Sequence, residues 1–459
     1  MSRKFLFAVL FCLLQCVDEG VRAEAAKLAD GYRGIWYMNQ PTGDEHRYKY
    51  SGGLGTYPQQ HTPIAVYSAA AKKTYFCYGG ATGNPRELAC MVSYFDHAMG
   101  MVPRPRIVLT KPTGDAHENP TLQIDEAGHV WVFCNTHGPA QNSYIFRSTS
   151  PYSIDEFEEA ARTNFSYSQP WVVPGEGFLF LHTRYGGGRR LHWITSRDGR
   201  EWSEPAPLAA VAQGHYQISW RHGKRVATAF NYHPREGGLN ARTNLYYLET
   251  DDLGATWRTA AGEAVPTPLV DPQNSALVHD YEADDRLVYL KDINFDAAGR
   301  PVILYLTTGG YAPGPASGER AWFTAHWTGA AWQRRAFTTS DHNYDYGSLY
   351  TEDGAWRIVA PTEPGPQPYG TGGEMVLWTS RDEGRTWNRE KQLTSGSQFN
   401  HTYARRPVDA HQHFYAFWAD GNPLEPSESR LYFTDREGSR VWQLPTTMEE
   451  EFAAPLMVR

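Results

Sequence analysis

Five side chains that can move protons or bind anions stand at matching places along the chain. His117 and Tyr167 each precede a proline that opens an apolar run, whereas His137, Arg184 and Tyr232 each follow the next such run. Imidazole and phenol groups serve as general acids and bases, and a guanidinium binds carboxylates through paired hydrogen bonds. Their recurrence at equivalent places predicts that the five converge on one side of a shared site.

A structural explanation exists for each of the five residues taken alone. His117 fits a turn, His137 fits a loop cap, and the two tyrosines fit as large amphipathic side chains that fill a channel. Arg184 fits an ion pair with Glu176, and single ion pairs are common and weak. The shared placement, rather than any single residue, favours a functional set.

The elements that would position these residues are short β-strands. The chain has 459 residues, of which 41% are hydrophobic and 20% charged, with 42 Gly and 30 Pro. Apolar residues alternate along many short runs that end in Gly, Asn or Asp, and no long helical pattern competes with them. This composition excludes a disordered chain. The net charge of −8 disfavours nonspecific binding of nucleic acid.

One turn pattern recurs along the chain. The frame S/T-x-D-x-G-x-x-W, shorter by one residue in its first copy, occupies residues 196–202, 250–257 and 380–387, and loosely 434–442. The Asp caps its own turn, the Gly takes a left-handed conformation and the Trp packs between neighbouring units. The frame resembles the Asp-box of BNR-type β-propellers, which is a fold signature, and we assign it no chemistry.

These repeats predict an all-β chain that folds as a single seven-bladed β-propeller over residues 24–459. Innermost strands are expected to begin near seven positions, spaced for four-stranded blades: His61, His117, Tyr167, Tyr216, Leu287, His342 and His401. Residues 30–38 are expected to supply a strand that closes the ring against the last blade, which removes exposed sheet edges. The five side chains would then meet at one mouth of the central channel.

The first 23 residues predict a secretory signal peptide. Arg3 and Lys4 precede a short apolar run over residues 5–14, and small residues end the segment at Ala23. The run is too short to span a bilayer, and no later run reaches about 20 apolar residues. Its removal leaves three cysteines, which allow one pair but no disulfide framework: Cys77, Cys90 and Cys134. We expect a secreted or periplasmic protein.

Longer stretches resemble a known family. The segments YSGGLGTYPQQH at 50–61, HENP at 117–120, GFLFLHT at 177–183 and YLKDINFD at 289–296 resemble the BNR-4 repeat family. That family includes the seven-bladed ulvan lyases of polysaccharide lyase families 24 and 25. The resemblance runs from about residue 30 to residue 445. It implies a secreted lyase that cleaves an acidic, uronate-containing and ulvan-like polysaccharide, and we expect this enzyme to be a monomer.

The resemblance also implies roles for individual residues. Catalytic roles map to His117, Tyr167 and Arg184, and substrate-binding roles map to His137, Tyr232, Arg189 and Arg190. The interval between the tyrosine and the arginine is one residue longer here than the family pattern. Thr183, Tyr185 and Arg189 therefore stay open as alternatives for the tyrosine or the arginine.

The chemistry that the resemblance implies is a β-elimination, which removes the C5 proton of a uronate and expels the C4 oxygen. Arg184 would neutralise the carboxylate. Tyr167 would serve as base and acid in turn, because a nearby cation favours its phenolate, with His117 as partner or alternative base. No cofactor is required, while a structural calcium or zinc ion is left open. His411 and His413, two apart on a predicted strand, could clamp a cation, although a surface strand pair also explains them.

Two other functions stay open. A sialidase-like or other propeller glycoside hydrolase would share the Asp-boxes, and Arg106, Arg405 and Arg406 are available for its three arginines on one carboxylate. Sialidases, however, resemble six-bladed propellers. A non-catalytic carbohydrate-binding propeller would keep the aromatic residues of the channel.

Overall fold

The computed structural model describes residues 24–54, 60–352 and 354–459. The expected signal peptide lies outside these residues. The described chain is nearly all β, and its helical elements are three short 3-10 turns: η1 (Ala116–Glu118), η2 (Gly238–Ala241) and η3 (Pro315–Ser317). No helix in these ranges has the length and hydrophobicity needed to cross a bilayer.

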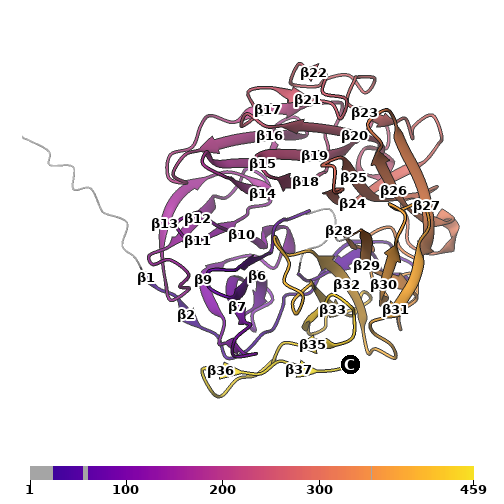
Figure 1. Ribbon diagram of the computed structural model, residues 1–459. Helices are drawn as coiled ribbons and strands as arrows, with labels where there is room; N and C mark the ends of the chain where they lie inside the picture. Colours follow the sequence, from indigo (N-terminus) through magenta and orange to yellow (C-terminus); the bar gives the residue numbers. More distant parts are fainter. Residues whose placement is uncertain (1–23, 55–59, 353) are drawn as a thin grey trace, which may run out of the picture.

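Seven antiparallel sheets of four or more strands surround a central axis (Figure 1). Blade 1 contains β5 (Ala65–Ser68), β6 (Lys73–Ala81), β7 (Leu88–Asp96) and β9 (Arg106–Lys111), with β2 (Lys27–Leu28) at its outer edge. Blade 2 contains β10 (Pro120–Ile124), β11 (Val130–Cys134), β12 (Ser143–Ser148) and β13 (Glu156–Thr163), with β1 (Glu24–Ala25) outermost. Blade 3 contains β14 (Ser166–Val173), β15 (Gly177–Tyr185), β16 (Arg189–Ser196) and β17 (Ala206–Ala209).

The remaining blades follow in chain order. Blade 4 contains β18 (Gln217–His222), β19 (Arg225–Tyr232), β20 (Thr243–Thr250), β21 (Trp257–Arg258), β22 (Ala264–Val265) and β23 (Leu277–His279). Blade 5 contains β24 (Leu287–Phe295), β25 (Pro301–Thr308), β26 (Arg320–Trp327) and β27 (Trp332–Ser340). Blade 6 contains β28 (Ser348–Glu352), β29 (Ala355–Glu363), β30 (Glu374–Ser380) and β31 (Asn388–Gln392). Blade 7 contains β32 (Asn400–Arg405), β33 (Ala416–Gly421), β34 (Leu431–Thr434), β35 (Val441–Gln443) and β37 (Leu456–Met457).

The prediction of a seven-bladed β-propeller is therefore confirmed. The innermost strands β10, β14, β18, β24 and β32 begin within three residues of the predicted positions, while β5 and β28 begin four and six residues later. The difference at β28 has a local cause: residues 341–347 before it form a buried turn, in which the carboxylate of Asp345 accepts hydrogen bonds from the backbone N–H groups of His342 and Gly372.

Ring closure differs from the expectation. Residues 30–38 add no strand to blade 7, because its strands all come from the C-terminal part of the chain. Instead, Gly34 forms isolated bridges with Ser429 of blade 7 and Gly80 of blade 1. The strand β3 (Tyr37–Pro41) pairs with β4 (Tyr48–Gly52) as a separate hairpin. The strand β36 (Phe452–Ala453) pairs with β8 (Val102–Pro103), so that the C-terminal segment reaches back to the connection inside blade 1.

Blades 1 and 7 meet directly along an interface that we call the seam. The backbone of Val408 donates to Ala65 O at 2.9 Å and accepts from Tyr67 N at 2.9 Å. Aromatic rings pack across the same interface, with Phe76 5.1 Å from Phe417 and Phe95 5.2 Å from Phe433 between ring centroids. The seam is thus held by apolar burial, a few backbone hydrogen bonds and the short β36–β8 pair rather than by a long strand shared between the two blades.

The Asp-box turns have the predicted structure. In the 250–257 copy, Asp252 accepts a hydrogen bond from Thr256 N at 2.8 Å, Gly254 has φ of 87°, and Trp257 packs 5.4 Å from Trp193 of the preceding blade. The copies at 196–202 and 380–387 share the capped turn and the left-handed Gly. All of these turns connect the third and fourth strands of a blade, away from the axis.

The three cysteines within the described ranges do not form a pair. Cys77, Cys90 and Cys134 are buried and free. They pack within the apolar layer of blades 1 and 2, so the fold is stabilised by its core rather than by disulfides.

Candidate active site

A carboxylate joins two imidazoles where the chain enters blade 2. Asp115 is the N-cap of η1, and its Oδ1 lies 2.5 Å from Nδ1 of His117 while its Oδ2 lies 2.7 Å from Nδ1 of His137. The two imidazole rings are stacked, with centroids 4.0 Å apart and planes at 9°. The predicted pairing of His117 with His137 is therefore present in space.

This geometry sets the tautomer of both rings. A carboxylate only accepts hydrogen bonds, so each Nδ1 carries a proton, and in the neutral form of a ring its Nε2 presents a lone pair. Burial works against the ionised form of Asp115, but the charges and hydrogen bonds of His117 and His137 outweigh it and hold the pKa of Asp115 well below its usual value. Burial, helped by His137, lowers the pKa of His117 although Asp115 opposes it. A neutral His117 with an oriented Nε2 is suited to accept a proton.

Tyr167 faces this pair from the first strand of blade 3. Its ring centroid lies 6.0 Å from that of His117 and 6.4 Å from that of His137. The Tyr167 hydroxyl contacts the hydroxyl of Tyr185 at 2.6 Å. Tyr167 has φ of 56°, a left-handed conformation that is rare outside glycine, and β14 slips in register at this point. This bulge directs the side chain into the mouth.

Buried hydrogen bonds fix the entries to blades 2 and 3. The Asn135 side chain donates to Asn119 O at 2.8 Å and accepts from Ser168 N at 2.9 Å, so it ties η1 to the residue after Tyr167. An ion pair between Lys111 and Glu118 is buried beside it. These contacts give the short loops a single conformation, as a reactive cluster requires.

The arginine of the cluster is Arg189 rather than Arg184. Arg189 pairs with Tyr185 across β15 and β16, and its guanidinium lies 5.4 Å from the Tyr185 ring and 5.8 Å from the Tyr216 ring. Arg184 lies on the opposite face of β15, in a cavity of about 360 Å³ that Trp202 also lines. Successive side chains in a strand point to opposite faces, so a one-residue difference in alignment decides which residue reaches the mouth. Convergence of Arg184 with the histidines is the part of the expectation that the structure corrects.

The same alternation removes Tyr232 from the cluster. Its hydroxyl donates to Glu282 at 2.5 Å, and its ring packs 6.3 Å from Tyr246 in blade 4. The next residue, His233, takes the place facing the mouth, with its ring 4.7 Å from Tyr216. Arg190 also stays outside the cluster, since its guanidinium donates to the backbone carbonyls of Ala210 and Gly187.

The hairpin β3–β4 adds residues that the sequence did not indicate. Tyr37 and Tyr50 pack against His117 with ring centroids 5.6 Å and 6.5 Å away. Lys49 is only 3% exposed and donates to the side chain of Asn240. The hairpin comes from the N-terminal segment, far in sequence from blades 4 to 6, and no local motif marks its approach to the mouth.

Positive charge gathers at this mouth. Burial, together with the charges of Arg242 and Arg189, lowers the pKa of Lys49 to about 7. Arg242 is fully buried, with its guanidinium 5.0 Å from the Tyr216 ring and 5.5 Å from the Tyr344 ring. No carboxylate within the described ranges forms an ion pair with Lys49 or Arg189. Buried cations of this kind are an anion-binding arrangement.

The ligand atoms of Asp115, His117 and His137 also lie within 4.8 Å of one another, so the three residues together fit a metal ion. The Nδ1 atoms of both histidines are already used by Asp115. A bound ion would therefore compete with the arrangement that leaves Nε2 free for proton transfer.

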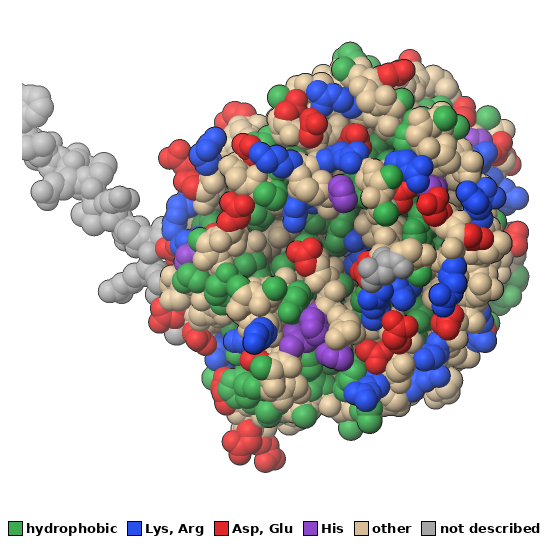
Figure 2. All heavy atoms as spheres, in the orientation of Figure 1, with side chains coloured by type: hydrophobic (Ala, Val, Ile, Leu, Met, Phe, Trp, Pro, Cys, Tyr) green, Lys and Arg blue, Asp and Glu red, His purple; other side chains and the backbone are tan. Residues whose placement is uncertain are grey.

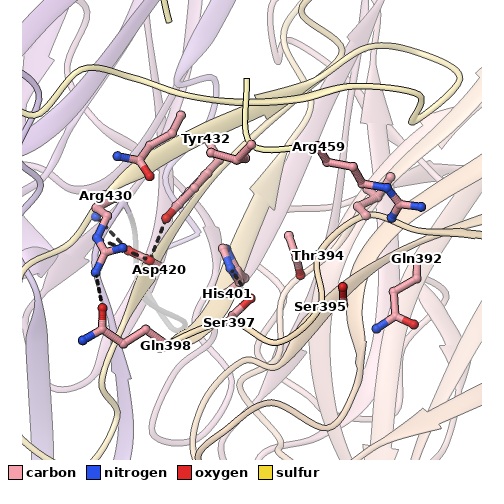
Figure 3. A pocket seen from close by; sticks show the side chains of 13 residues that line it. Gln392, Thr394, Ser395, Ser397, Gln398, His401, Asp420, Arg430, Tyr432 and Arg459 are labelled. Carbon is pink, nitrogen blue, oxygen red and sulfur yellow. Dashed lines mark hydrogen bonds and ion pairs between the residues drawn. The ribbon is translucent and has the colours of Figure 1, made fainter. Parts of the chain in front are cut away.

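A second cavity, of about 580 Å³, lies between blades 6 and 7 (Figure 3). His401 points toward Ser397 there, with Nε2 2.9 Å from the Ser397 hydroxyl. Trp418 donates to Nδ1 of His401 at 3.0 Å, so the proton of the neutral ring sits on Nε2 and points at Ser397, whose hydroxyl donates to Glu374. His401 cannot accept a proton from Ser397 in this arrangement, and the pair is a structural relay rather than an activated nucleophile.

The three arginines considered for a sialidase do not converge. Arg106 pairs with Asp155 and Glu451 at the rim, whereas Arg406 lies 3.5 Å from the Trp220 ring. Arg405 lies over the ring of Tyr346. Together with the seven blades, this separation argues against the sialidase arrangement.

Comparison with known proteins places these features in a family. The BNR_4 model, described as "BNR repeat-containing family member", matches residues 93–340. The chain is 24% identical over 321 residues to an ulvan lyase of Nonlabens ulvanivorans, in an alignment that covers 60% of this chain and 65% of that enzyme, just under two thirds of its length. It is 22% identical over 389 residues to an ulvan lyase of Alteromonas sp. (strain LOR), covering 71% and 75% of the two chains.

A solved structure of a PL25 ulvan lyase superposes with a TM-score of 0.68 at 17% identity, covering 90% of this chain and 96% of that one. The same enzyme type bound to -[GlcA(1-4)Rha3S]- gives a TM-score of 0.67 at 16% identity. At this identity the likeness concerns the fold. The family model covers more than half of the sequence and includes both histidines, Tyr167 and Arg189. The chain belongs to the BNR repeat-containing family BNR_4.

Proposed function

We propose that this protein is a polysaccharide lyase that cleaves an acidic, ulvan-like polysaccharide by β-elimination. The observation that carries the proposal is the pair of imidazoles oriented by Asp115, facing Tyr167 and beside the cation Arg189. The similarity to two curated ulvan lyases supports the same reaction class. An extracellular place of action is the expectation for an enzyme whose substrate is a polymer.

In this reaction His117 is the base. Its Nε2 takes the C5 proton of the uronate, the electron pair of that C–H bond forms the C4–C5 double bond, and the bond from C4 to the linking oxygen breaks. Asp115 stabilises the imidazolium that forms on His117 through the Nδ1 hydrogen bond. His137, stacked on the same carboxylate, is the second acceptor and a substrate contact.

Tyr167 is the acid that protonates the leaving oxygen. Burial and the neighbouring phenols of Tyr185 and Tyr216 raise the pKa of Tyr167 well above its usual value, and the opposing charge of Arg189 does not reverse this. The phenol is therefore protonated at rest, in contrast to the phenolate expected from a nearby cation. Tyr185, whose pKa burial raises to about 12, contacts the same hydroxyl and completes a path along which the proton is restored.

Arg189 neutralises the uronate carboxylate in place of Arg184. Charge neutralisation makes the C5 proton more acidic, because the carbanion that develops is otherwise repelled by the carboxylate. The three phenols around Arg189 raise its pKa although burial opposes them, so that it stays charged. Arg242, although buried, adds positive charge beside the mouth, and Lys49 adds charge when it is protonated, so both would favour further anionic groups of the polymer.

The proposal is tested by mixing the purified protein with ulvan and with other uronate polysaccharides, and by following the absorbance of the unsaturated uronide. Wild type should produce this absorbance, and Tyr167→Phe and His117→Asn should each lose it while keeping the circular dichroism spectrum of the fold. Reducing ends that accumulate without the absorbance would identify a hydrolase instead. Binding without either signal would identify a carbohydrate-binding propeller.

The pH profile gives a second readout. His117 must be neutral, and because its pKa is lowered, activity should persist as the pH falls below about 6.5, the ordinary histidine value. Tyr167 must be protonated, and because its pKa is raised, activity should persist above about pH 10 until other groups titrate or the fold is lost. A narrow optimum between these two values would contradict the assignment of base and acid.

A further inference from the structure

A group of histidines lies at the seam, apart from the mouth. Figure 2 shows imidazole side chains gathered on the face in view, where blades 1 and 7 adjoin. His97 follows β7 of blade 1, and His411 and His413 lie in the connection between β32 and β33 of blade 7. The segment around the latter two is a tight turn with a bridge between His411 and Phe414, not the strand predicted from the sequence.

The three rings form a chain across the interface. The centroid of His97 lies 3.9 Å from that of His411, and the centroid of His411 lies 5.2 Å from that of His413. Tyr67 of blade 1 covers the inner side, 4.8 Å from His411 and 5.3 Å from His97. His413 is exposed and His411 is half-buried, so an ion has access from solvent.

One ring nitrogen of His97 makes a hydrogen bond, and the other has no partner among the described residues. Its Nε2 lies 2.8 Å from the hydroxyl of Thr74, which fixes the ring. Its Nδ1 is buried and has no hydrogen-bond partner within the part of the chain that the structure describes. Metal-binding histidines are commonly oriented in this way, through a hydrogen bond from the nitrogen that does not bind the metal.

The three imidazole rings supply nitrogen atoms as candidate ligands. Asp96, adjacent to His97 in the chain, accepts hydrogen bonds from the N–H groups of Ala98 and Met99 and caps its own turn. The proposed ligand set therefore consists of the three imidazoles and does not use Asp96.

We propose that His97, His411 and His413 together bind one divalent transition-metal ion such as Zn²⁺, and that this ion fastens blade 1 to blade 7. Three imidazoles and a water molecule make a tetrahedral site, and imidazole nitrogens favour zinc, nickel and copper over calcium and magnesium. Binding requires rotation of the exposed His413 ring toward the other two. It also displaces the 3.2 Å hydrogen bond from His413 N to Nδ1 of His411.

The proposed ion would lie between blades 1 and 7 and would therefore stabilise the closed ring. Blades 1 and 7 are separate sheets, joined by side-chain packing, a few backbone hydrogen bonds, the Gly34 bridges and the short β36–β8 pair. Opening of a propeller at this interface separates His97 from His411 and destroys the site. An ion that binds only the closed ring stabilises it by mass action.

The experiment uses the whole protein, stripped with a chelator and then dialysed against Zn²⁺ or Co²⁺. Bound metal is counted by elemental analysis, and the melting temperature is measured with and without metal. His411→Ala, His413→Ala and His97→Ala are compared with His222→Ala, an exposed histidine outside the group. The same measurements on His117→Asn report any ion at Asp115, His117 and His137.

We expect wild type, His222→Ala and His117→Asn to retain the seam ion, to melt several degrees higher with Zn²⁺, and to give the visible spectrum of tetrahedral Co²⁺. Each of the three seam variants should lose one equivalent of metal and the rise in melting temperature. His411→Ala and His413→Ala are at partly exposed positions, so they keep the test decisive if His97→Ala fails to fold. Unchanged metal content in these variants, or no metal retained by wild type, would overturn the proposal.

Discussion

The Asp-box turns and the mouth of the channel use similar residue types in opposite ways. In the turns, a glycine takes a left-handed conformation in each copy, preceded in two copies by a left-handed Leu253 or Glu383. The carboxylates of Asp198, Asp252 and Asp382 accept backbone hydrogen bonds within their own loops. At the mouth, the left-handed residue is Tyr167, and Asp115 is shared by two imidazoles. Among the described residues, Nε of Arg189 and both ring nitrogens of His61 are buried there without a hydrogen-bond partner.

This contrast distinguishes residues that stabilise the fold from residues that are expected to take part in the reaction. A turn that occurs in several blades is under the same structural demand each time, so the capping carboxylate and the left-handed glycine recur in each copy. The mouth residues occur once each, in strained or uncompensated settings that only the surrounding blades sustain. Residues that repeat are expected to stabilise the fold, and unrepeated ones are expected to react or bind.

The largest effect on activity is expected from the hydroxyl of Tyr167. Tyr167→Phe removes the proposed acid and should lower kcat by about 10²- to 10⁴-fold, the range for loss of a general acid. The measurement is the rate of unsaturated-product formation on ulvan. Tyr144→Phe, at an outer strand of blade 2, is the matched control and should keep full activity. Equal rates for the two variants would remove Tyr167 from the reaction.

The largest effect on stability is expected from an Asp-box tryptophan. Trp257 is 2% exposed and packs on Trp193, so Trp257→Ala should lower the free energy of unfolding by about 3–5 kcal/mol. Denaturant unfolding measures this loss. The kcat of the folded fraction should not change, and a parallel fall in kcat would show that the turns and the mouth are coupled after all.

Substitution of two arginines tests which residue of blade 3 faces the mouth. Arg189→Met should lower kcat by about 10²- to 10³-fold, because it removes the charge that stabilises the developing anion. Arg184→Met, on the other face of the hairpin, should leave kcat within about twofold, because a surface substitution away from the site has little effect. The reverse result would return the role of neutralising the carboxylate to Arg184, as the sequence predicted, and would contradict the assignment of Arg189.

The smallest effect is expected from the carboxylate of one turn. Asp252→Ala removes the hydrogen bond from Thr256 N and should lower the free energy of unfolding by about 1 kcal/mol, with no change in activity. Thermal unfolding monitored by tryptophan fluorescence resolves such a change. A loss as large as that of Trp257→Ala would mean that the carboxylate, not the indole, holds the turn.

Much of the site was predictable because part of it is local. His117 and Asp115 share one turn, although no sequence pattern singled out Asp115, and repetition of the blade places His137 and Tyr167 near His117. The predictions for Arg184 and Tyr232 were wrong for the same reason. Successive side chains of a strand point to opposite faces, so the strand register decides which of two neighbouring residues faces the mouth. Bulges such as those in β14 and β19 shift this register without a clear signal in the sequence.

The sequence by itself determined the blade repeat, the number of blades and the turns, because these depend on alternation and on residues that act within a few positions of each other. Only the tertiary structure decided which faces meet. The hairpin carrying Lys49 reaches the mouth from the N-terminal segment, and His97 meets His411 across the seam, more than 300 residues apart in the chain. Contacts of that separation are fixed by ring closure, which no local pattern records.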